Sequence, residues 1–159
     1  MKLFSIPIGL IVSLVATAGL ADNFTVGAIE VVNPWTRATP RGAPIGAAYM
    51  TLTNKGSTAD RLIGGSTNVA GRFEVHTMVT EGGIAKMRPV TGGVEIKPGS
   101  TVTLEPGGLH AMLIGLKQPI APGTRVTGTL VFERAGKVDV EFAVQPLGQP
   151  APSHSEHSK

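Results

Sequence analysis

Hydrophobic and polar residues alternate with a period of two along much of this chain. Near the C-terminal end, Val138, Val140 and Phe142 alternate with Asp139 and Glu141. This pattern is typical of half-buried β-strands, whose successive side chains point to opposite faces. It predicts strands over residues 25–32, 47–53, 61–66, 72–80, 84–90, 93–96, 101–104, 110–116, 125–133 and 137–145.

Glycine and proline separate these segments, and the chain holds 21 Gly and 12 Pro. No stretch sustains an amphipathic helical period for more than a turn or two, and there is no internal repeat. Many short strands joined by Gly- and Pro-containing turns favour a sandwich or a barrel. Residues 22–146 have the length of one ordinary domain with its own core. The sequence therefore predicts a single-domain, all-β protein.

The beginning of the chain differs from this pattern. Lys2 is the only charged residue before Asp22, and the apolar stretch between them ends in small residues. This arrangement is typical of a secretory signal peptide, here residues 1–21, cleaved after Ala18 or Ala21. A membrane anchor is the less favoured alternative. We expect a periplasmic protein with no stable membrane insertion after the signal is removed.

Charge and cysteine content exclude several classes of protein. Without Lys2, 13 Lys and Arg residues face 11 Asp and Glu residues, a net charge of +2. That balance argues against a nucleic-acid partner. The chain has no cysteine, which excludes thiol redox chemistry, thiolate metal sites and a blue-copper centre.

Histidine and methionine are the remaining candidates for chemistry. His76 and Met78 lie two residues apart in one predicted strand, and His110 and Met112 lie two apart in another. Met87 follows the first pair in the sequence. Residues two apart share a face of a strand, and the apolar neighbours of both pairs occupy the opposite faces. Both pairs are therefore predicted to lie on faces that the core does not need.

Thioether sulfur is a soft, uncharged ligand that favours Cu(I), and imidazole binds copper in either oxidation state. Zinc more usually recruits Cys, His or carboxylate. Methionine also avoids the thiol oxidation expected in an exported protein. The alternative is that each methionine is a packing residue and each histidine is solvated. Met50, in the predicted strand 47–53, is expected to be such a core residue.

The spacing of these residues resembles a known family. Ten residues separate His76 from Met87, and twenty-two separate Met87 from the motif His110-Ala111-Met112. This pattern is similar to the signature of PCu(A)C-type periplasmic copper chaperones. Further segments resemble the family in the expected order, and the likeness extends over about residues 26–145: 33–39, 47–54, 60–62, 74–76, 87–90 and 106–113.

The resemblance implies a cupredoxin-like Greek-key β-sandwich that binds Cu(I) and is not an enzyme. The implied ligands are His76, Met87, His110 and Met112. The family delivers copper to the binuclear copper site of cytochrome c oxidase subunit II, often alongside a Sco-type thiol protein.

Some family members also bind Cu(II) through a C-terminal extension rich in His or Met. Here residues 147–159 have the composition of a disordered tail. They supply only His154 and His157, so a solvated tail without copper is the alternative.

Other roles near the predicted site stay open at this stage. Met78 is either an additional ligand or an apolar shield, and Glu74 either orients an imidazole or is solvated. Trp35 is expected in the core, and Arg37 is expected to have a structural role, with docking near the copper as the alternative.

Two other functional classes remain as alternatives. One is an exported β-sandwich that mediates interactions without a metal. The other is a copper-dependent oxidase, which the small number of histidines in the domain argues against.

Overall fold

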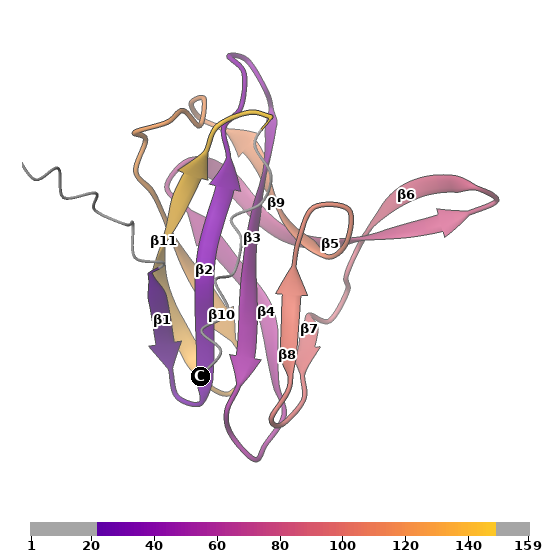
Figure 1. Cartoon of the computed structure of the whole chain (residues 1–159), viewed down its shortest axis with the longest axis vertical. Helices are drawn as coiled ribbons and strands as arrows, with labels where there is room; N and C mark the ends of the chain where they lie inside the picture. The colour runs from indigo at the N-terminus through magenta and orange to yellow at the C-terminus, as the bar shows by residue number, and fades with distance from the viewer. Residues whose placement is uncertain (1–21, 149–159) are drawn as a thin grey trace, which may run out of the picture.

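The computed structural model describes residues 22–148, and this part of the chain consists of β-strands and connecting turns (Figure 1). Among these residues there is no helix with the length and apolar character needed to cross a membrane. The predicted signal peptide, residues 1–21, and both tail histidines, His154 and His157, lie outside the described residues. The strands are β1 (Asn23–Val26), β2 (Ile29–Arg37), β3 (Ile45–Asn54), β4 (Asp60–Thr67), β5 (Ala70–Glu81), β6 (Ile84–Pro89), β7 (Val94–Ile96), β8 (Thr101–Leu104), β9 (His110–Leu116), β10 (Val126–Phe132) and β11 (Gly136–Gln145).

Hydrogen bonds connect these strands in the order β6-β5-β9-β3-β2-β11-β10-β4-β7, with β1 added to β2 and β8 added to β3. Strands β2 and β11 are parallel, and the other pairs are antiparallel. The path folds back on itself, because β4 and β5 contact each other without being paired. At that contact a Cβ added to Gly65 would lie 3.1 Å from the Phe73 ring. The all-β sandwich prediction is confirmed.

The alternation read from the sequence decides which side chains fill the interior. In β11, Val140 and Phe142 are buried, whereas Asp139 and Glu141 between them are not. Met50 is 2% exposed and belongs to the core, as predicted. The largest fully buried side chains come from both halves of the chain: Ile29, Met50, Leu52, Leu62, Ile96, Leu104, Leu113, Ile120, Leu130, Phe132 and Phe142.

The predicted strand 25–32 is wrong, because the chain turns within it. Val26 pairs with Ile29, and Gly27 adopts φ +54° in the turn between β1 and β2. Glycine enters this left-handed region without the steric cost that a Cβ brings. The second strand then continues past its predicted end, through an irregularity in pairing between Val32 and Trp35.

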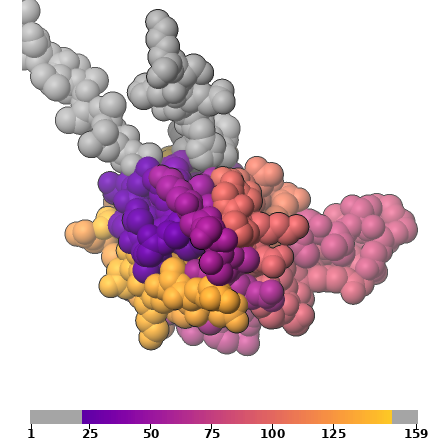
Figure 2. All heavy atoms as spheres, turned by 90° about the horizontal axis from the view of Figure 1, so that it is seen from below, coloured from indigo at the N-terminus to yellow at the C-terminus, as the bar shows by residue number. Residues whose placement is uncertain are grey.

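Strands β5 and β6 form a hairpin that projects from the sandwich (Figures 1 and 2). Its two turn residues, Gly82 and Gly83, have φ values of +58° and +79°. Positive φ at both central residues is the requirement of a type I′ turn, which matches the twist of the strands. All six residues of β6 are exposed, and β6 ends the hydrogen-bonded path with β5 as its neighbour.

Candidate metal site

Strand pairing brings the two predicted His-x-Met pairs together. In the register of β5 and β9, His76 lies directly opposite His110, and their ring centroids are 6.2 Å apart. In the β5–β6 hairpin, Met78 lies directly opposite Met87. The prediction that the two pairs would converge depended on neighbouring strands, and β5 and β9 are neighbours.

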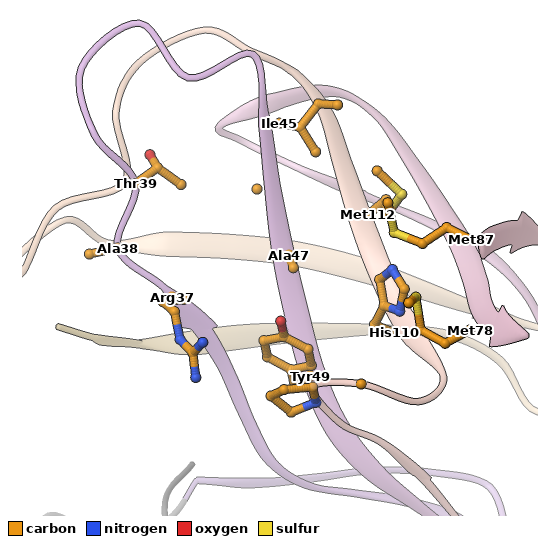
Figure 3. A pocket seen from close by; sticks show the side chains of 13 residues that line it. Arg37, Ala38, Thr39, Ile45, Ala47, Tyr49, Met78, Met87, His110 and Met112 are labelled. Carbon is orange, nitrogen blue, oxygen red and sulfur yellow. The ribbon is translucent and has the colours of Figure 1, made fainter. Parts of the chain in front are cut away.

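These side chains adjoin an open cavity of about 410 Å³ at one end of the sandwich (Figure 3). Met78, Met87, His110 and Met112 line it. His76 does not line the cavity, but its ring lies beside that of His110, which does. The rest of the wall comes from the end of β2, the β2–β3 loop, β3 and the β8–β9 loop: Arg37, Ala38, Thr39, Ile45, Gly46, Ala47, Tyr49, Pro106 and Gly107.

The four predicted ligands differ sharply in exposure. His110 is 7% exposed and Met112 is 8% exposed, and the His76 side chain is 13% exposed. Met87, on the edge strand, is 56% exposed. His110 and Met112 are therefore buried and His76 is largely covered, whereas Met87 lies at the opening of the cavity.

Hydrogen bonds fix which nitrogen of each imidazole is available. Nδ1 of His110 lies 2.9 Å from the carbonyl oxygen of Gly108. A carbonyl only accepts, so Nδ1 carries the proton and Nε2 keeps its lone pair. Nε2 of His76 donates to Oε2 of Glu74 at 3.0 Å, which leaves the lone pair on Nδ1. The geometry thus supports the orienting role considered for Glu74.

Tyr49 lines the cavity and packs against the Trp35 ring behind it. The rings of Trp35 and Tyr49 have centroids 4.4 Å apart, and the Arg37 guanidinium lies 5.6 Å from the Trp35 ring centroid. Burial raises the pKa of the Tyr49 phenol, and the positive charge of Arg37 opposes this effect. Trp35 is buried, as predicted.

Sequence reasoning did not identify Tyr49 as part of the site. Its position next to the core residue Met50, on the other face of β3, was the available signal.

The donors at the cavity are two imidazoles and three thioethers, all uncharged when the imidazoles are neutral. Among residues 22–148 no group of three or more His, Asp or Glu side chains is placed to hold a metal ion. Nitrogen and soft sulfur donors without carboxylates fit Cu(I) better than a hard cation. The residues present therefore suit the ion predicted from the sequence.

The sequence profile of one protein family, described as "LpqE-like: Putative lipoprotein LpqE-like", matches residues 29–144. The chain belongs to this family. One similar protein, "Putative lipoprotein Lxx21020" of Leifsonia xyli subsp. xyli, is 34% identical over 117 residues. That match covers 74% of this chain and 69% of the relative.

Two solved structures place this LpqE-like chain among PCuAC domains. The copper-bound PCuAC domain from PmoF2 is 30% identical, with a TM-score of 0.67, and the match covers 79% of this chain and 98% of that one. The CuI-DR1885 structure from Deinococcus radiodurans is 32% identical, with a TM-score of 0.59 and coverage of 81% and 83%. The PCu(A)C-type resemblance and the cupredoxin-like fold are thereby confirmed.

Proposed function

We propose that this protein is an exported chaperone that binds one Cu(I) ion and passes it to another protein. The ligands are His76, Met87, His110 and Met112. The observation that carries the proposal is the strand register, which sets the two imidazoles opposite each other, beside three methionines that line one cavity. The similarity to a copper-bound PCuAC domain supports the choice of metal.

The arrangement suits transfer rather than catalysis. Two neutral imidazoles and two thioethers add no charge, so the bound ion keeps its single positive charge. Buried His110 and Met112 hold the ion inside, and exposed Met87 is the ligand that an acceptor can replace first. The protein forms and breaks only coordination bonds to its cargo, and we assign it no enzymatic activity.

The proposed recipient is the binuclear copper site of cytochrome c oxidase subunit II, with a Sco-type thiol protein as a second partner. The chain would act in the periplasm after removal of residues 1–21. The description of a relative as a lipoprotein supports export. Cu(II) binding by His154 and His157 in the tail is a further part of the proposal, to be tested separately.

X-ray absorption at the copper edge of the Cu(I)-loaded chain tests the binding site. We expect a first shell of mixed nitrogen and sulfur that loses one sulfur in Met112→Leu. Met50→Leu is the matched control, because that methionine lies in the core and should leave the shell unchanged. A shell of nitrogen and oxygen, identical in both variants, would mean that the methionines only pack.

Transfer is tested by mixing the loaded chain with the copper-free soluble domain of subunit II. After separation, the copper content of the two proteins should show the metal in the recipient. A His110→Ala chain, loaded under the same conditions, should deliver less because it retains less. Copper that stays with the wild-type chain would exclude this recipient without excluding the site.

A further inference from the structure

Met87 differs from the other proposed ligands in its support as well as in its exposure. It lies on β6, all of whose residues are exposed and whose hydrogen-bonded neighbour is β5. His110 and Met112 instead lie on β9, between β5 and β3. An acceptor approaching the cavity therefore meets Met87 first. Loss of Met87 alone would leave the ion with three of its proposed ligands.

A second sulfur lies directly across the hairpin from Met87. Met78 is its partner in the β5–β6 register. Directly opposed residues in an antiparallel pair share one face, with Cβ atoms about 4.5–5.5 Å apart. Both side chains line the cavity together with His110 and Met112 (Figure 3). The two thioethers thus reach the same space from adjacent strands.

Burial distinguishes Met78 from a packing methionine. Met50, which fills the core, is almost completely buried, whereas Met78 is half-buried on the cavity wall. Met78 also shares its strand face with His76, two residues before it. Its neighbours Thr77 and Val79 point to the other face of β5. The Met78 sulfur is therefore accessible from the cavity and adjoins the proposed imidazole ligands.

We propose that Met78 is a reserve ligand that binds Cu(I) when Met87 leaves it. The idea rests on the proposed function. When an acceptor draws Met87 away, the bond from copper to the Met87 sulfur breaks and a bond to the Met78 sulfur forms. Both ligands are neutral, so the ion stays Cu(I) and no proton or electron moves. The chain keeps a four-coordinate ion until the acceptor supplies its own ligands.

The test compares Met87→Leu, Met78→Leu and the double variant in the full-length chain. Leucine nearly conserves volume, so all three should fold, which thermal unfolding by circular dichroism checks. X-ray absorption of the Cu(I) forms counts sulfur atoms, and competition with a Cu(I) chelator measures affinity. We expect Met87→Leu to keep two sulfur ligands and to lose less than about tenfold in affinity, whereas the double variant should lose about a hundredfold and one sulfur.

The outcomes separate this proposal from the one on which it rests. If wild-type chain binds no Cu(I) through sulfur, the chaperone site itself is wrong. If wild-type chain shows two sulfur ligands but Met87→Leu shows one, and adding Met78→Leu changes nothing further, Met78 is only part of the wall. Met87→Leu alone decides the point should the double variant fail to fold.

Discussion

The two imidazoles keep their lone pairs on different nitrogens, and for His76 this follows from its hydrogen bond to Glu74. Its carboxylate accepts from Nε2 of His76 at 3.0 Å and also lies 3.4 Å from the Arg72 guanidinium. For His110, the backbone carbonyl of Gly108, just before β9, accepts from Nδ1 in the same way. Partners of this kind fix the tautomer and the direction of a metal-binding imidazole.

Glu74→Ala should therefore weaken Cu(I) binding by about 10- to 100-fold. Glu74→Gln should retain most of the affinity, because its amide oxygen still accepts from Nε2 of His76. Long-range ¹⁵N–¹H NMR of the metal-free chain should show Nε2 protonated in wild type and a mixture of tautomers in Glu74→Ala. An unchanged tautomer together with unchanged affinity would show that Glu74 is merely solvated.

Period-two alternation was sufficient to place Glu74, His76 and Met78 on one strand face. It could not show that His76 lies opposite His110, or that Met78 lies opposite Met87. Those contacts depend on register, which is set by turn geometry and by packing between distant strands. Spacing along the chain carries no such information, so the sequence identified the donors but left their partners open.

At the level of elements, the β5–β6 hairpin positions Met87, and the hairpin depends strongly on its two-glycine turn. Strand β6 is hydrogen-bonded to β5 and contributes no buried side chain to the core, since all its residues are exposed. Ion pairs on the hairpin surface link Glu81 with Lys86 and Arg88. Such exposed pairs contribute little to stability. The Gly82-Gly83 turn is therefore the main determinant of how the hairpin closes.

Gly83→Val should loosen the hairpin without unfolding the domain. A branched side chain at φ +79° costs about 1–2 kcal/mol or more in this left-handed region. We expect faster hydrogen exchange of the β6 amides and weaker Cu(I) binding, with little change in the melting temperature. Gly82→Asn is the control, because asparagine is accepted at the first position of a type I′ turn. A large fall in melting temperature would mean that the hairpin contributes to the core.

The two strands of this hairpin were predicted close to their observed bounds, because two glycines separate the two runs, although their pairing was not predicted. The N-terminal hairpin was missed because Gly27 stands alone within a similar run. The irregularity between Val32 and Trp35 was also missed, and it contains Asn33 at φ +48°. Proline at position 34 is compatible with such a bulge, although it usually argues against a central strand.

For the molecule as a whole, a buried carboxylate far from the copper cavity ties distant segments together. Asp60, at the start of β4, lies with Asn54 at the opposite end of β3 from Ile45. Its oxygens accept from the backbone N–H groups of Arg61 at 2.7 Å and of Arg134 and Ala135 at 2.9 Å. The last two belong to the turn between β10 and β11, so one side chain ties the start of β4 to that turn at this end of the sandwich.

Burial alone would raise the pKa of the Asp60 carboxyl. The three backbone N–H donors, together with the positive charge of Arg134, outweigh burial and lower the pKa below its usual value of 3.8. A depressed native pKa means that the unfolded chain binds the proton more readily. The stabilisation is therefore complete at pH values above the unfolded pKa and is lost as the pH falls through the native one.

Asp60→Ala should lower the free energy of unfolding by about 2–3 kcal/mol at pH 7, since it leaves three part-buried N–H groups without their acceptor. In wild type, urea unfolding between pH 6 and pH 2.5 should show the free energy falling below about pH 4. Asp60→Asn should be less stable at neutral pH and should lose less on acidification, because it has no proton to bind. Cu(I) affinity at neutral pH should be unchanged in Asp60→Asn, since the two sites lie at opposite ends of β3. If wild type and Asp60→Asn lose the same free energy of unfolding on acidification, other carboxylates cause that loss. Asp60 would then contribute only hydrogen bonds that do not depend on its charge.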